Sequence, residues 1–127
     1  MSYDYVIDSY AWIEYFKGTK QGEIASKFIE SGKAVTSVIS IAELSEKYLK
    51  EGKDFQERLD FIISQTKIIN LDSNLAKVAG RLNFENKKKI KDFGMADAII
   101  LATAGLVNGK VVTGDEHFKN LNSIMIN

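Results

Sequence analysis

The chain has 127 residues, of which 45% are hydrophobic and 27% charged, a composition typical of a globular protein with one core. It contains no cysteine and a single histidine, which excludes disulfides, thiolate zinc sites and a multi-histidine metal site within one chain, so that any metal must be held on oxygen. The formal net charge is zero, which excludes the overall positive field of many nucleic-acid-binding proteins.

The first half of the chain alternates short apolar segments with amphipathic ones. β-branched and aromatic residues predict strands over residues 3–7 and 34–36. Apolar residues spaced by three and four predict helices, and glycines at positions 18, 32 and 52 end three of them. These helices are expected over residues 9–17, 21–31, 37–50 and 54–65.

The second half continues the same alternation. A strand over residues 67–71 precedes a long helix that Asp72 or Ser73 can cap and that extends to residue 86. After a lysine-rich connection, residues 94–106 form the most apolar helix, and we expect it to be central. A strand over 110–113, a helical turn over 116–120 and an edge strand over 123–126 complete the chain.

Strands separated by helices indicate the α/β class, with a mainly parallel sheet of four to five strands covered by helices in a single domain, residues 1–127. Ligands of such sheets bind beyond the carboxyl ends of the strands. Asp8 and Asp115 directly follow strands, whereas Glu43 and Asp97 belong to helices that can start near the same edge. We therefore expect these four acids to face one cleft.

Each acid also has a purely structural explanation. Asp8 and Asp115 can cap the helices that follow them, and the sequence from Ser40 to Glu43 fits a capping box. Asp97 can favour a helix start through the helix dipole. Asp97 is nevertheless unusual, because an unpaired carboxylate is costly among the apolar residues MADAIILATAG. A bound Mg²⁺ or Mn²⁺ would explain it, since both ions accept oxygen ligands.

Four segments carry the four acids in order: YVIDSYAWIEYF, SVISIAELSEKY, MADAIILATA and VVTGDEHFKNL. With them the chain resembles, over nearly its whole length, the PIN-domain ribonucleases of the VapC toxin type. The resemblance implies a PIN-like three-layer α/β/α domain. It also implies that Asp8, Glu43, Asp97 and Asp115 surround Mg²⁺ or Mn²⁺, and that an activated water cuts RNA.

The same resemblance bears on the neighbouring residues. Ser9 and Thr113 match hydroxyl positions that support the acids, although both are equally suited to local turns or caps. Gly94 stands where the family often has serine, which predicts a different cap for that helix.

Several polar residues near the motifs are interpreted as surface. Asp92 and Glu116 are expected to be solvent-exposed, and His117, beside Phe118, is interpreted as a surface or packing residue instead of a general base. The lysine run, Lys87, Lys88, Lys89 and Lys91, is interpreted as a solvated segment because it lacks supporting aromatic residues for phosphate binding.

The leading hypothesis is a metal-dependent endoribonuclease that is the toxin of a toxin–antitoxin pair. Tyr10, Trp12, Tyr15 and Phe16 are candidates for an interface with an antitoxin or in a homodimer. One alternative is a phospho-receiver with Asp72 as acceptor and Thr113 as switch, and another is a PIN-like scaffold that does not cut. No apolar run approaches the ~20 residues that span a membrane, so we expect a soluble cytoplasmic protein.

Overall fold

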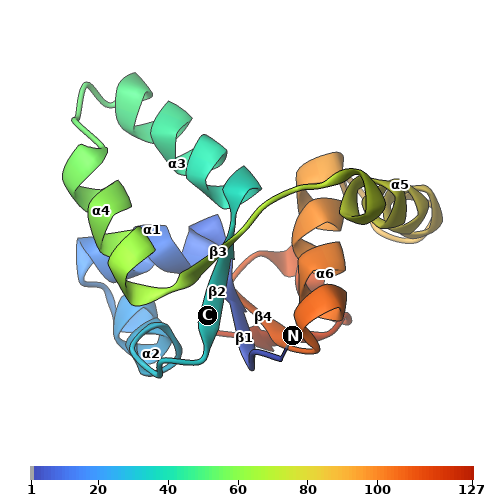
Figure 1. Ribbon diagram of the computed structural model, residues 1–127, viewed down its shortest axis with the longest axis horizontal. Coiled ribbons are helices and arrows are strands. Elements are labelled where there is room, and N and C mark those ends of the chain that lie inside the picture. The colour runs from blue at the N-terminus through green and yellow to red at the C-terminus, as the bar shows by residue number, and fades with distance from the viewer. Residues whose placement is uncertain (1) are drawn as a thin grey trace.

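The strands form one parallel sheet, as seen in a computed structural model that describes residues 2–127 (Figure 1). The sheet has five strands in the order β3-β2-β1-β4-β5, and every neighbouring pair is parallel. The strands are β1 (Tyr5–Ile7), β2 (Ala34–Ser37), β3 (Lys67–Ile69), β4 (Lys110–Thr113) and β5 (Ser123–Met125). The predicted α/β class and the edge position of the last strand are confirmed.

Six α-helices and one 3₁₀ helix connect these strands. They are α1 (Ser9–Lys17), α2 (Lys20–Ile29), α3 (Val38–Lys50), α4 (Gln56–Gln65), α5 (Ser73–Lys87), α6 (Met95–Val107) and η1 (Glu116–Phe118). The predicted bounds differ mainly at the ends. β1 starts two residues later than predicted, and the predicted helical turn over 116–120 is the shorter η1.

Alternating side chains of the strands face two separate cores. Val6 and Val111 point into a core with α5 and α6, whereas Ile7 and Val112 point into a core with α1 and α2. This follows from the period of two along a strand. Figure 1 shows the resulting layers, with α5 and α6 on one side of the sheet and α1 and α2 on the other. The three-layer α/β/α architecture predicted from the sequence is therefore present.

The apolar helix α6 crosses the sheet against β1, β2 and β4, which accounts for its burial on most sides. Opposite to it, α1 and α2 pack so closely that a Cβ at Gly22 would overlap the backbone carbonyl of Glu14. Helices α3 and α4 extend beyond the sheet as an arm (Figure 1). Within residues 2–127 no helix is long and apolar enough to cross a membrane.

Candidate metal and active site

The register of the two central strands brings Asp8 to Thr113. Ile7 of β1 pairs with Val112 of β4, and the Asp8 amide donates to the Val112 carbonyl at 3.1 Å. Directly beyond this pair, Thr113 Oγ1 donates to Asp8 Oδ2 at 2.8 Å. Asp8 occupies the N-cap position of α1, but its side chain makes no capping hydrogen bond. Asp8 is therefore the N-cap by position, as one interpretation predicted, but its carboxylate does not cap the helix.

Asp8 is only 6% exposed. Burial raises its pKa from an ordinary value of 3.8 to about 7, although the hydrogen bond from Thr113 acts in the opposite direction. The negative charges of Glu43 and Asp115 contribute to this raised pKa, after burial as the main cause. The site therefore holds more negative charge than its surroundings compensate.

The turn after β4 presents Asp115 to the same site. The Thr113 hydroxyl that donates to Asp8 also accepts from the Asp115 amide at 2.9 Å. Asp115 Oδ1 in turn accepts from the His117 amide at 2.9 Å, so Asp115 caps η1, one of its two predicted roles. One threonine side chain thus fixes the first and the last acid relative to each other.

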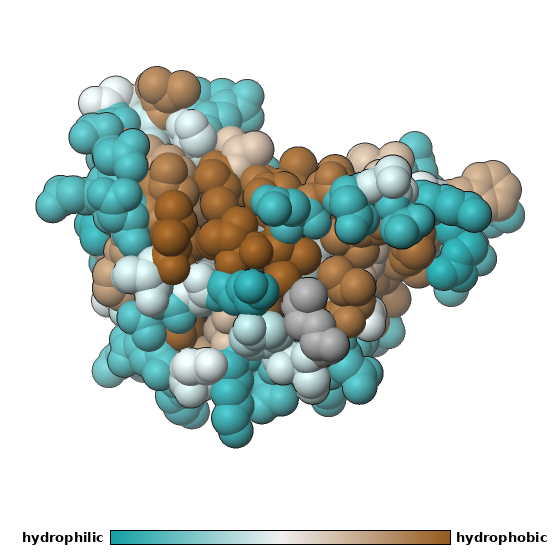
Figure 2. All heavy atoms as spheres, viewed as in Figure 1, coloured by the Kyte–Doolittle hydropathy of each residue, from teal (hydrophilic) through white to brown (hydrophobic). Residues whose placement is uncertain are grey.

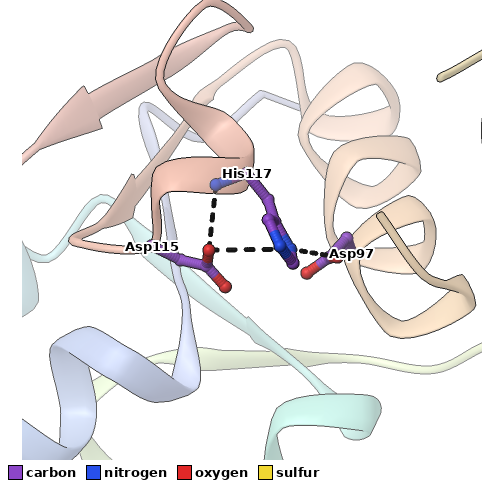
Figure 3. A group of neighbouring side chains, drawn as sticks. All are labelled: Asp97, Asp115 and His117. Carbon is purple, nitrogen blue, oxygen red and sulfur yellow. Dashed lines mark hydrogen bonds and ion pairs between the residues drawn. The ribbon is translucent and has the colours of Figure 1, made fainter. Parts of the chain in front are cut away.

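Asp97 lies in the first turn of α6 and points toward this loop. Its Oδ2 accepts a hydrogen bond from the Gly94 amide at 3.0 Å. Gly94 is the N-cap of α6 and has no side chain to form a cap, so the Asp97 carboxylate provides the hydrogen-bond partner at this helix end. The same oxygen lies 2.8 Å from His117 Nδ1, and this nitrogen lies 3.6 Å from Asp115 Oδ1. Figure 3 shows the imidazole between the two carboxylates.

The interpretation of His117 as a surface or packing residue is incomplete, because its partly exposed ring lies near Phe93 but also contacts the Asp97 carboxylate. Burial alone lowers the pKa of His117, but the hydrogen bond with Asp97 and the charges of Asp115, Asp97 and Asp92 outweigh burial and raise the pKa overall. The neighbouring Phe118 is buried, whereas the imidazole of His117 lies at the Asp97 carboxylate. The informative signal is instead the position of His117 two residues after Asp115, in the loop that follows a strand.

Glu43 approaches the site from α3. Partial burial raises its pKa, the Ser9 side chain lowers it as a hydrogen-bond partner, and the charges of Asp97 and Asp115 raise it again. The net pKa is raised, although much of the side chain still meets solvent. Glu43 therefore faces the same acids as Asp8, with Ser9 beside it.

The predicted capping box from Ser40 to Glu43 is wrong. The N-cap of α3 is Ser37, whose Oγ accepts from the Ile39 amide at 3.2 Å. Ser40 lies inside the helix, fully buried, and its hydroxyl has no hydrogen-bond partner in the described part of the chain. Glu43 is consequently not engaged in a cap.

The donor set fits a divalent cation. One ligand atom from each of Asp97, Asp115 and His117 lies within 4.8 Å of the other two. Asp8 and Glu43 are coupled to these acids through the repulsion that raises their pKa values. A cation would relieve that repulsion, and carboxylate oxygens are the ligands that Mg²⁺ and Mn²⁺ prefer, whereas His117 Nδ1 is already engaged with Asp97. Asp92 and Glu116, predicted to be at the surface, are exposed.

The geometry does not favour a phospho-receiver. Asp72 follows the edge strand β3 and uses its carboxylate to cap α5, accepting from the Leu75 amide at 2.9 Å. Thr113 bonds to Asp8 and the Asp115 amide instead.

Solved structures provide the first comparison. A toxin–antitoxin complex from Klebsiella pneumoniae contains a chain with a TM-score of 0.78 and 23% sequence identity, covering 98% of each chain. A chain of VapBC2 from Rickettsia felis, bound to a DNA fragment from its promoter, has a TM-score of 0.74 and 24% sequence identity. The match covers 95% of this chain and 96% of the other. At these identities the similarity shows the fold. Among curated proteins, no sequence matches this chain.

The family comparison is more decisive because it depends on the sequence. The model of the PIN domain matches residues 5–123, a span that includes all four acids and both supporting hydroxyls. The chain therefore belongs to the PIN domain family.

Proposed function

We propose that this PIN domain is a metal-dependent endoribonuclease that hydrolyses phosphodiester bonds of RNA. Asp8, Glu43, Asp97 and Asp115 are its proposed catalytic and metal-binding residues. The observation that carries the proposal is a continuous chain of hydrogen bonds from Asp8 through Thr113, Asp115 and His117 to Asp97. It joins acids from three parts of the sequence at the carboxyl edge of the sheet, where α/β proteins bind ligands.

The residues of the chain have separate tasks in this proposal. Mg²⁺ or Mn²⁺, when bound, lowers the pKa of a water and stabilises charge on the phosphate. Thr113 holds Asp8 in place, and the Gly94 amide holds Asp97. His117 lies 2.8 Å from Asp97 and can neutralise part of the charge of the cluster when protonated. Ser9 lies beside Glu43 and lowers the pKa of its carboxyl.

Cleavage of a fluorescent RNA by purified protein tests the proposal. We expect cleavage in Mg²⁺ or Mn²⁺, none in EDTA, and none by Asp8→Asn, which retains the size of the side chain. Asp60→Asn is the matched control, because Asp60 is exposed on α4 and remote in sequence from the acids. Cleavage by Asp8→Asn at the rate of wild type would defeat the assignment.

We also propose that the protein is the toxin of a toxin–antitoxin pair, acting in the cytoplasm as a homodimer. Support comes from the solved relatives, which include VapBC assemblies. A groove of about 710 Å³ between α1, α3 and α4 supplies a place for the antitoxin. Tyr15, Phe16 and Phe61 line it, whereas Trp12 of the predicted aromatic surface is fully buried.

Expression in bacteria tests this second proposal. Wild type should arrest growth and Asp97→Asn should not, and new RNA ends should appear only with wild type. Co-purification of a small protein whose binding is weakened by Phe61→Ala would support the groove. Growth arrest that is equal for both chains would contradict a toxin that acts by cutting RNA.

A further inference from the structure

An exposed aromatic side chain lies among the cations of α5. Phe84 is 66% exposed, although side chains of this kind are ordinarily buried. Lys88, one turn further along the chain, places its Nζ 4.1 Å from the centroid of the Phe84 ring. Phe84 thus supplies the aromatic neighbour that the lysine run was expected to lack.

Phe84 belongs to a longer pattern on this helix. Lys77, Arg81, Phe84 and Lys88 are separated by four, three and four residues and are all exposed. At about 100° per residue they fall within a sector of about 60°, so they line one face of α5. We call these four residues the α5 stripe. In Figure 2 the outer part of α5 is mainly hydrophilic, with hydrophobic surface at its far end.

Further lysines extend the stripe toward the acids. Lys87, Lys89 and Lys91, the lysine turn, are exposed and form no salt bridge with any residue in the range 2–127. In the α5 stripe only Arg81 has an acidic neighbour, Glu85 at 3.9 Å, and a pair that exposed is weak. The positive charges are therefore free to meet a ligand.

The lysine turn is fixed to the candidate active site. Gly94 is three positions after Lys91, and three steps along the chain span at most about 11 Å. The Gly94 amide donates to Asp97, and the buried Phe93 ring lies 6.4 Å from the His117 ring between centroids. The lysine turn thus leads along the backbone directly into the segment that contacts Asp97 and His117.

The lysines beside the site can offset the repulsion between its carboxylates and the phosphates of the proposed RNA substrate. Clustered carboxylates repel the phosphates of RNA, and a divalent cation offsets this only close to the bond that is cut. A chain with zero net charge has no general field to attract the rest of the strand. Unpaired lysines beside the acids, with an exposed ring, provide a local attraction instead.

We propose that the α5 stripe and the lysine turn bind single-stranded RNA and lead it to the acids, an inference that rests on the endoribonuclease function proposed above. Phe84 stacks on a base, and the lysines contact phosphates. A single strand is favoured over a duplex because its bases offer free faces for stacking. A protein partner is less well matched, because the stripe has one apolar side chain among three cations.

Fluorescence anisotropy of a labelled single-stranded RNA, measured in EDTA, tests the proposal without requiring cleavage. Phe84→Ala should weaken binding by about 5- to 150-fold, the range expected for one stacked base. Lys87→Gln with Lys89→Gln should reduce the slope of log affinity against log salt by about 0.7 for each phosphate that is no longer neutralised. On α2, Ile24→Ala and Lys20→Gln with Lys27→Gln are matched controls, since Ile24 is exposed and neither lysine forms a salt bridge within residues 2–127.

The outcomes separate this proposal from the one on which it rests. Stripe-dependent binding without any metal-dependent cleavage would support the stripe and defeat the endoribonuclease. Binding that the stripe variants leave unchanged, or that the α2 controls weaken equally, would overturn the stripe even if RNA is cut. Equal effects of Phe84→Ala on duplex and single-stranded RNA would contradict stacking. If the stripe variants change the self-association of the protein but not its affinity for RNA, the stripe is a contact between protein chains and the proposal is wrong.

Discussion

Replacing Asp8 by asparagine removes a buried charge and preserves the shape of the side chain. The asparagine Oδ1 can still accept from Thr113, whose Oγ1 lies 2.8 Å from Asp8 Oδ2. Burial and the neighbouring acids raise the pKa of Asp8 from 3.8 to about 7, so ionised Asp8 opposes folding when no metal is bound. We expect Asp8→Asn to be more stable than wild type above pH 7 in EDTA.

The size and pH dependence follow from proton linkage. A carboxyl whose pKa is raised on folding contributes stability that is fully present below the unfolded pKa and is lost as the pH rises through the folded pKa. The advantage of Asp8→Asn should therefore grow by about 1.4 kcal/mol per pH unit between about pH 4 and 7 and then stay level. A shift from 3.8 to about 7 sets an upper limit of about 4 kcal/mol.

Urea unfolding followed by the fluorescence of Trp12, which is fully buried, measures this difference. Mg²⁺ or Mn²⁺ should then stabilise wild type and have little effect on Asp8→Asn, because a ligand stabilises only the state that binds it. Asp60→Asn controls for the loss of an exposed acid. A difference that does not change with pH, or a less stable Asp8→Asn at pH 8, would refute the assignment of a strained, buried charge.

Three further predictions concern single side chains. Thr113→Val should lower the free energy of unfolding by about 1–3 kcal/mol in urea titrations, because the Asp115 amide loses its acceptor and Asp8 its donor, and Thr113→Ser should restore most of it. Gly22→Ala should lower the free energy of unfolding by about 1–3 kcal/mol in the same assay, because the new Cβ would overlap a backbone carbonyl. Gly80→Ala has open space at its Cβ and should leave the free energy of unfolding unchanged or raise it. His117→Ala should destabilise the metal-free protein more at pH 6 than at pH 9. The pKa of His117 is raised on folding, so its contribution is complete below its unfolded pKa and is lost above its folded pKa. Equal losses at both pH values would contradict the ion pair with Asp97.

Much of the fold could be predicted because local patterns agree with the tertiary structure. The spacing of apolar residues located the helices, β-branched and aromatic content located strands, and the parallel sheet follows from helices between the strands. Asp8 and Asp115 could be assigned to one edge because each follows a strand closely. The predicted ends were less accurate, since the start of a helix depends on which residue caps it, and α3 is capped by Ser37 instead of Ser40.

What the sequence could not supply depends on contacts between distant residues. The bond between His117 and Asp97 joins positions 20 residues apart and exists because η1 and the start of α6 meet beyond the sheet. The raised pKa of Asp8 depends on burial by several elements. The exposure of Phe84 was equally hidden, because a phenylalanine on an amphipathic helix is expected to face the core.

The ends of the cleaved RNA test the central claim most directly. Hydrolysis by water activated among Asp8, Glu43, Asp97 and Asp115 leaves one phosphomonoester and one hydroxyl end, with no 2′,3′-cyclic phosphate. Mass spectrometry of fragments from a defined RNA should show only such ends, in Mg²⁺ or Mn²⁺, and no fragments with Asp97→Asn. Cyclic phosphate ends, or fragments that form equally in EDTA, would mean that the 2′-hydroxyl attacks without a metal and would contradict the account.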